Sequence, residues 1–244
     1  MAEVLPTLAA AGRVSTILFM HNHAGGTEQL ITAVGRERVL LGFPGASGFR
    51  QGAVVKYLLI PQQPTTLGEI EGPPTPRVQE IAEVFRDAGF PVAISQNMDA
   101  WLKIHAVFVT AVCGALYCAG GDNYQLAQST ETLALFADGV REGLRLLRML
   151  GLPPAPLNLR AIFTWMPKAI TVAYWRRFFA STRGQYYFAE HARVAWVEMK
   201  MLADEVRSVL SVSAADEPAF DRLCGAIDGY AATQIAHIPK ETLR

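Results

Sequence analysis

The segment from Asp99 to Ala119 constrains the fold of this chain more than any other feature. Its residues are almost all apolar, and its length suits a single long helix. The apolar stretch from Ile104 to Ala119 is shorter than the about 20 residues that a bilayer requires, and His105 and Thr110 interrupt it. We therefore predict that this segment is the buried core helix of a folded domain.

The pattern of the chain changes where this helix begins. Before Asn97, β-branched apolar runs alternate with helical segments, whereas no convincing strand follows Asp99. The sequence therefore predicts two domains. Residues 1–97 form an α/β portion with an incomplete Rossmann-like sheet, and residues 98–244 form an all-α helical domain.

The expected elements follow from apolar periodicity and from turn and cap residues. In the first portion we expect strands at Ser15–Met20, Val39–Phe43 and Pro91–Ser95, and helices at Glu28–Val34 and Pro76–Ala88, with Thr27 and Thr75 as N-caps. Val54–Ile60 and Thr66–Ile70 flank a Pro-Gln-Gln-Pro turn and are predicted to pair as a hairpin. The expected later helices are Asp99–Ala119, Thr130–Leu150, Ile170–Ser181, Ala189–Leu210 and Glu217–Ala236.

Charge and cysteine content narrow the class of partner. Lysine plus arginine and aspartate plus glutamate balance at 22 each, so no global field attracts nucleic acid or an anionic membrane. The expected partner is a small molecule or another protein. Cys113, Cys118 and Cys224 form no ligand or disulfide pattern, and the N-terminus lacks the features of a signal peptide. We therefore expect reduced thiols and a cytoplasmic location.

The first candidate binding feature is the loop from His21 to Gly26, between a predicted strand and a predicted helix. Open α/β sheets bind ligands at the carboxyl ends of their strands. The amide of Asn22 can donate and accept hydrogen bonds, which suits a carboxamide or a hydroxy acid. The alternative is an ordinary turn that uses asparagine and glycine for their backbone geometry. No third ligand accompanies His21 and His23, so we predict no metal site.

The second candidate is Lys103, near the start of the apolar helix. Burying an ammonium costs several kcal/mol unless it is paired, so such a lysine often serves in chemistry. At helical spacing, Lys103, Thr110 and Tyr117 share one stripe, with Gly114 leaving a gap between the last two. Two structural alternatives stay open. Asp99 can pair with Lys103 across the first turn, or the amine can reach solvent along its apolar stem.

The third candidate is Glu198, in the predicted helix Ala189–Leu210. Helical spacing places Glu198 on an apolar stripe with residues such as Val194 and Met201, where a carboxylate needs a partner. A polar network with His191 on the same stripe is one interpretation. The other is that a lysine and a carboxylate from two helices converge on one polar substrate.

Several of these features occur in the order in which the ketopantoate reductase (2-dehydropantoate 2-reductase) family has them. They are Asn22 in a strand-end loop, Gly68–Gly72 after a hairpin, Asp87–Val92 before a strand, Trp101–Lys103 opening a helical domain, and Glu198 in a late helix. The chain resembles this family over nearly its whole length.

The resemblance implies a dinucleotide-binding domain followed by a helical domain of the 6-phosphogluconate dehydrogenase C-terminal type. It also implies NADPH-dependent reduction of a 2-oxo acid, the chemistry of pantothenate biosynthesis. Lys103 would then be the general acid, Glu198 would hold the substrate hydroxyl, and Asn22 would lie beside nicotinamide and substrate. Thr110, on the stripe of Lys103, is a further candidate substrate-binding residue.

The chain also departs from the family pattern. No strand followed by G-x-G-x-x-G occurs, so the chain resembles a member that lacks the N-terminal part of the dinucleotide-binding domain. Val107 and Ala111 stand where members often have asparagine, and Tyr186 stands where they have polar groups. These residues predict a less polar pocket.

Two functional hypotheses follow. The first is a reductase that acts on a 2-oxo acid or a related ketone. The second is a catalytically silent binding or dimerisation module, because a chain without the phosphate-binding turn should bind dinucleotides poorly. A homodimer is the expected assembly if the helical half packs on itself.

Overall fold

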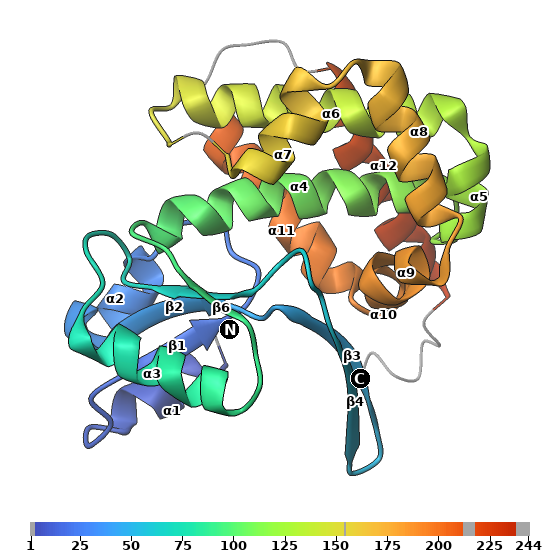
Figure 1. Cartoon of the computed structure of the whole chain (residues 1–244). Helices are drawn as coiled ribbons and strands as arrows, with labels where there is room; N and C mark the ends of the chain where they lie inside the picture. The colour runs from blue at the N-terminus through green and yellow to red at the C-terminus, as the bar shows by residue number, and fades with distance from the viewer. Residues whose placement is uncertain (1–2, 154, 212–217, 238–244) are drawn as a thin grey trace. The chain divides into compact units, whose positions relative to one another are not determined.

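A computed structural model describes residues 3–153, 155–211 and 218–237. The chain divides into two compact units, residues 1–103 and 104–244 (Figure 1). The predicted domain boundary at Asn97 precedes helix α4 (Met98–Cys118), whereas the division falls inside that helix. The α/β portion followed by a helical region confirms the predicted fold class.

The first unit is built on a four-stranded sheet with the order β1 (Ile17–Met20), β2 (Val39–Phe43), β5 (Thr65–Gly68) and β6 (Val92–Ile94). Strands β1 and β2 are parallel, β2 and β5 antiparallel, and β5 and β6 parallel. The two central strands are buried almost completely. The near-continuous apolar run of β2 is what a strand covered on both faces requires, whereas β5 buries two threonines beside Leu67.

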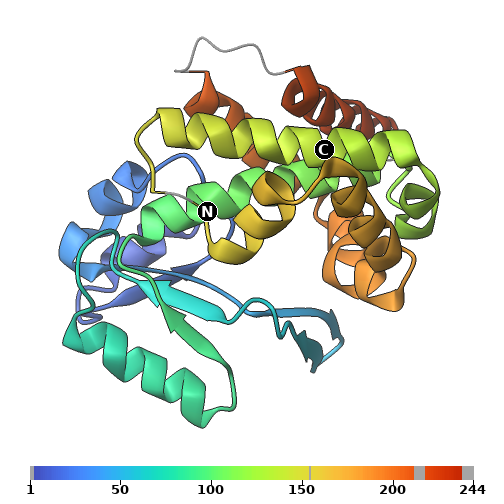
Figure 2. The same ribbon diagram turned by 45° about the horizontal axis from the view of Figure 1, so that its top comes forward.

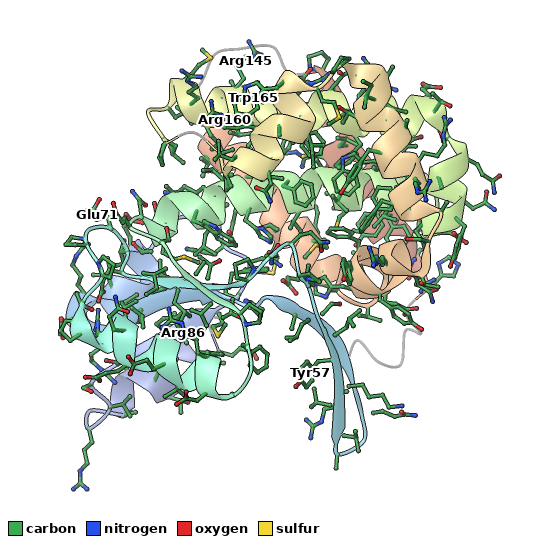
Figure 3. All side chains as sticks on the ribbon, in the orientation of Figure 1. Tyr57, Glu71, Arg86, Arg145, Arg160 and Trp165 are labelled. Atoms are coloured by element: carbon green, nitrogen blue, oxygen red, sulfur yellow. The ribbon has the colours of Figure 1, made fainter. Side chains whose placement is uncertain are left out.

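The predicted hairpin is wrong in its pairing. Strand β4 (Val54–Leu59) pairs with β3 (Ala46–Gln51), a segment for which no strand was predicted. Gly52 turns the chain between them at φ 62°, a conformation that glycine adopts without strain. Strand β5 joins the main sheet instead. The hairpin exposes much of its apolar surface, including Tyr57 (labelled in Figure 3). The Tyr57 ring stacks on Phe90 at 5.7 Å between ring centroids.

Three α-helices accompany the sheet: α1 (Leu5–Ala10), α2 (Glu28–Val34) and α3 (Pro76–Asp87). Helix α1 was not predicted. Arg38, in the short 3₁₀ helix η1 (Arg36–Arg38), donates to the carbonyl oxygens of Leu8 (3.0 Å), Ala11 (2.7 Å) and Val34 (3.3 Å). One guanidinium therefore satisfies the carboxyl ends of α1 and α2 together.

The expected cap of α3 is also different. Thr75 occupies the N-cap position, but its hydroxyl donates to Glu69 at 2.5 Å rather than accepting from the helix.

The core of the first unit is a single apolar cluster that joins sheet, helices and the start of α4. Its buried members are Leu5, Ile17, Phe19, Leu30, Val34, Val39, Leu41, Ile70, Met98 and Leu102.

In the second unit, α4 is the central element and the other helices pack around it (Figures 1 and 2). They are α5 (Asn123–Gln128), α6 (Thr130–Met149), α7 (Leu157–Arg160), α8 (Lys168–Phe179), α9 (Thr182–Gly184), α10 (Glu190–Val194), α11 (Trp196–Leu210) and α12 (Pro218–Ala236), with π-helical turns η2 (Ala161–Trp165) and η3 (Gln185–Ala189). The predicted helix Ala189–Leu210 is therefore interrupted at Ala195.

Helix α4 is long and apolar enough to cross a membrane, and it is the one such helix among the described residues. Most of its surface, however, is buried inside the protein, as in the core helix of a folded domain. This burial agrees with the predicted core helix.

Small residues allow the close helix packing around α4. Gly114 of α4 lies against the backbone of Leu223 of α12, and Gly139 of α6 lies against the same leucine's side chain. Glu142 of α6 accepts hydrogen bonds from the backbone N–H groups of Ala219 (3.0 Å) and Phe220 (2.9 Å). A neighbouring helix thus supplies the N-terminal cap of α12.

Candidate active site

The loop from His21 to Gly26 lies where the sequence predicted it. It follows β1 directly, and the parallel register Met20↔Gly42 places the carboxyl ends of β1 and β2 at one edge of the sheet. Gly26 adopts φ 88°, and the His23 ring contacts its carbonyl oxygen. Asn22 therefore projects from a turn at the sheet edge where α/β proteins bind ligands.

The first turns of α4 run along β2 toward this same edge. The Asp99 N–H donates to the Ile70 carbonyl at 3.1 Å, close to the amino end of β2. Two residues later, the Trp101 ring packs on Phe43, the last residue of β2, at 5.6 Å between centroids. Helix α4 therefore runs toward the carboxyl end of β2, and Lys103 follows Trp101 on that course.

Lys103 is paired with Asp99. Its Nζ lies 2.5 Å from Asp99 Oδ2, one helical turn earlier, and the two side chains are only 20% and 25% exposed. The structure therefore contains the ion pair across the first turn that the sequence offered as one alternative. The pair holds the ammonium in a fixed position while one side stays open to solvent.

The rest of the predicted stripe is largely used in packing. The Tyr117 hydroxyl donates to the Ala192 carbonyl at 2.6 Å, and its ring stacks on Tyr230 at 4.1 Å. The predicted gap at Gly114 is filled, because a Cβ there would lie 2.5 Å from the Leu223 carbonyl oxygen. The Thr110 hydroxyl differs: it is buried and has no hydrogen-bond partner among the residues that the structure describes.

The predicted apolar environment of Glu198 is wrong. Its side chain is 45% exposed, and Val194 and Met201, which were to share a buried stripe with it, are 80% and 58% exposed. The buried face of α11 is Met199, Leu202, Ala203, Val206 and Leu210. The break at Ala195 shifts the helix phase, and packing in the second unit selects which face is covered.

Glu198 nevertheless lies close to α4. Its carboxylate is 3.9 Å from Nε2 of His191, which belongs to α10. The effect of Glu198 on two residues of α4 shows that it is also close to that helix. Burial raises the pKa of the Cys113 thiol to about 12, with the negative charge of Glu198 adding to the effect. Burial likewise raises the pKa of Tyr117, and Glu198 contributes there too. The contact between Cys113 Sγ and Met199 Sδ, at 3.3 Å, joins the two helices at this point.

Two of the expected pocket residues have packing roles. A Cβ on Gly143 of α6 would lie 2.5 Å from the Val107 side chain, so Val107 belongs to the contact between α4 and α6. Ala111 is fully buried. Position in the sequence alone could not distinguish these packing residues from residues that line a pocket. The third expected residue, Tyr186, is half-exposed.

A groove of the first unit lies away from the Asn22 loop. It has a volume of about 630 Å³ and is lined by Arg36, Glu69, Glu71 and Arg77 among others, beside the start of β2 (Figure 3 labels Glu71). The hydrogen bond from Arg77 lowers the pKa of Glu69, outweighing the effect of burial. Glu69 also accepts from Thr75. Arg77 and Glu69 therefore form a structural ion pair, and Arg36 pairs with Glu71.

Among the described residues, no three histidine, cysteine, aspartate or glutamate side chains cluster as a metal site. Cys113, Cys118 and Cys224 are all free thiols, and burial raises the pKa of Cys224 to about 12. None of the three thiols is activated as a nucleophile.

Comparison with solved structures shows which proteins share this fold. A D-mandelate dehydrogenase in complex with NADH matches 95% of this chain and 76% of its own, with a TM-score of 0.69 and 11% identity. A candidate ketopantoate reductase from Ralstonia solanacearum matches 96% of this chain and 75% of its own, with a TM-score of 0.66 and 16% identity. A dimeric ketopantoate reductase from Staphylococcus aureus matches 88% of this chain and 66% of its own, with a TM-score of 0.52 and 13% identity.

No protein-family model and no curated protein matches the sequence. At these identities the structural matches show a shared fold. They confirm the resemblance to the ketopantoate reductase family at that level, with D-mandelate dehydrogenase as a second protein of the same fold.

Proposed function

We propose that this chain is an oxidoreductase that reduces a 2-oxo acid or a related ketone with a nicotinamide cofactor. The observation that carries the proposal is the course of α4. It leads Lys103 toward the sheet edge that also bears the Asn22 loop, within a fold shared with two kinds of 2-oxo or 2-hydroxy acid oxidoreductase.

The described residues fit one end of a dinucleotide. The Asn22 amide can bind a carboxamide, as the nicotinamide end requires. The start of α2 fits a phosphate poorly, because the Glu28 carboxylate approaches Gly26 there and an anion would be repelled. The sequence also contains no G-x-G-x-x-G turn. The resemblance favours NADPH, while the D-mandelate dehydrogenase was solved with NADH.

The bound cofactor would supply the hydride that adds to the carbonyl carbon. Lys103 then gives a proton from its ammonium to the developing alkoxide oxygen, and its exposed side allows the amine to regain a proton from water. Asp99 holds the ammonium in place. By the family resemblance, Glu198 would hold the product hydroxyl and Asn22 would lie beside nicotinamide and substrate. Thr110 is a further candidate for binding the substrate.

A second candidate function is a binding or dimerisation module without catalysis. It is favoured by the missing phosphate-binding turn together with Glu28 at the start of α2. The dimeric state of the Staphylococcus aureus protein of the same fold supports a homodimer under either function. Calorimetric titration with NADPH and with NADH separates the two functions, because micromolar binding would contradict a silent module.

Turnover tests the reductase. The chain is assayed with each cofactor and a series of 2-oxo acids, and oxidation of the cofactor is followed by absorbance. For Lys103→Ala we expect kcat to fall by about 10²–10⁴-fold, the usual contribution of a positioned acid. For Glu198→Gln we expect mainly a higher KM.

Lys168→Ala is the matched control. Lys168 also begins a helix and pairs with an aspartate, Asp138, at 2.6 Å, but it is far along the chain from the proposed site residues. Thermal melting of both variants verifies that a change in stability does not explain a large kinetic difference. Equal kcat values for Lys103→Ala and the unmodified chain would remove Lys103 from the mechanism.

A further inference from the structure

One stretch of the second unit is strongly basic, although the chain as a whole is neutral. Residues 141–189 contain eight arginine or lysine residues but only one acidic residue, Glu142. The eight are Arg141, Arg145, Arg148, Arg160, Lys168, Arg176, Arg177 and Arg183. The Glu142 carboxylate is engaged with backbone N–H groups of α12. Charge totals, on which the expectation of no attraction to a membrane rested, average out this local excess.

Three arginines of α6 form a stripe beside η2. Arg141, Arg145 and Arg148 are spaced four and three residues apart, so they share one side of the helix. Arg141 donates to the carbonyl oxygen of Phe163 and, at 3.0 Å, to that of Met166. These two hydrogen bonds place the arginine side of α6 against η2 and the residue that follows it.

Exposed apolar side chains lie among these arginines. The Arg160 guanidinium lies 4.8 Å from the centroid of the Trp165 ring, and Leu157 is one turn before Arg160 in α7. Trp165 and Leu157 are 57% and 69% exposed, and Met149, at the end of α6, is 62% exposed. Figure 3 shows Arg145 at the same end of the second unit as Arg160 and Trp165. We define the basic patch as Arg145, Arg148, Met149, Leu157, Arg160 and Trp165.

Ion pairs do not neutralise the basic patch. Arg145, Arg148 and Arg160 form no ion pair with any residue that the structure describes, whereas Arg141 and Lys168 share Asp138, at 3.7 and 2.6 Å. Three positive charges are therefore available to an anionic partner. They lie beside large apolar side chains that gain free energy on leaving water.

We propose that the basic patch binds the surface of a membrane that contains anionic phospholipid. Guanidinium groups bind lipid phosphates, and each basic residue near an anionic membrane surface raises the affinity about fivefold. Tryptophan is typical of the headgroup level, and the side chains of Leu157 and Met149 enter the boundary of the acyl chains. The proposal concerns the second unit alone and does not depend on reductase activity.

The apolar part of the patch favours a membrane over a nucleic acid. A nucleic acid would bind the arginines, but it gains little from exposed aliphatic side chains such as Leu157 and Met149. Base stacking also needs an open aromatic face, and Arg160 already covers one face of the Trp165 ring. A lipid surface uses the charges and the apolar side chains together.

The test measures co-sedimentation of the full chain with phosphatidylcholine vesicles, with and without about one third phosphatidylserine. We expect binding only to the vesicles that contain phosphatidylserine, and loss of that binding when salt is raised from about 0.05 M to about 0.5 M. Arg148→Glu should weaken binding at least fivefold, because an attractive charge becomes repulsive. Arg86→Glu is the matched control, since Arg86 is also exposed in the last turn of a helix, α3 of the first unit.

Tryptophan fluorescence tests the apolar part of the contact. Trp165 is the most exposed of the four tryptophans, so vesicle binding should shift the emission to shorter wavelength. Trp165→Phe should remove this shift, whereas Trp196→Phe, in α11, should keep it. Circular dichroism verifies that each variant folds.

Three outcomes would overturn the proposal. The first is a chain that stays in solution with both kinds of vesicle. The second is equal vesicle affinity of Arg148→Glu and Arg86→Glu. The third is tighter binding to an oligonucleotide than to the phosphatidylserine vesicles, which would assign the basic patch to nucleic acid.

Discussion

His105 shows how one buried side chain ties the stability of this protein to pH. The residue is buried on α4, and burial lowers its pKa from 6.5 to about 3. The folded protein therefore keeps the imidazole neutral at pH values where the unfolded chain binds a proton. Proton binding by the unfolded state pulls the equilibrium toward unfolding.

We expect the free energy of unfolding to fall as the pH drops from 6.5 toward 3. This single group contributes a slope of at most about 1.4 kcal/mol per pH unit. Urea unfolding at a series of pH values measures the slope, and His105→Gln should flatten it. His237, which is exposed near the end of α12, provides the control substitution His237→Gln. Identical slopes for His105→Gln and the unmodified chain would contradict the assignment.

The environments of Lys103 and Glu198 were not equally predictable from the sequence. Asp99 stands four residues before Lys103, so their pairing was predictable from local geometry, and the structure contains it. The exposure of Glu198 was not predictable. Its place depends on the break at Ala195 and on which face of α11 meets the rest of the second unit, neither of which is encoded by helical spacing alone.

At the scale of elements, the contact between α4 and α12 depends on one missing side chain. Adding a Cβ at Gly114 would place it 2.5 Å from the Leu223 carbonyl oxygen and 2.8 Å from the Leu223 Cβ. The backbone of α12 cannot give way without moving the helix. We expect Gly114→Ala to lower the free energy of unfolding by about 1–3 kcal/mol, the usual cost of overpacking.

Gly225→Ala is the control for this substitution. Gly225 is also in a helix of the second unit, but no atom lies within 4 Å of the position that an alanine Cβ would occupy there. Alanine should therefore stabilise the helix by up to about 1 kcal/mol. Chemical denaturation of both variants gives the comparison. A Gly114→Ala protein as stable as Gly225→Ala would refute the close contact.

The hairpin is the clearest error among the predicted elements. The flanking turn residues identified Val54–Ile60 as a strand, and the structure has a strand at Val54–Leu59. They could not identify its partner, because pairing is decided by hydrogen bonds between segments apart in sequence. The Ala46–Gln51 strand was missed since its glycine and polar residues lack an apolar pattern.

The whole molecule carries equal numbers of acidic and basic residues, and its isoelectric point is about 7.0. Without net charge, copies of the chain do not repel one another. We expect solubility in a precipitant to pass through a minimum near pH 7 and to rise roughly two pH units to either side. Residual soluble protein measured across a pH series checks this. Solubility that is flat across the series would show that exposed apolar surface, rather than charge, controls association.

The sequence by itself determined the change from α/β to helical structure, the buried core helix and the Asn22 loop, and it included the pairing of Lys103 with Asp99 among its alternatives. Each depends on periodicity or on residues within a few positions, which act through local geometry. Only the tertiary structure decided the partner of β4, the exposed face of α11 and the filled gap at Gly114. Those features arise from contacts between distant segments, and apolar burial selects among helix faces that the sequence pattern leaves equivalent.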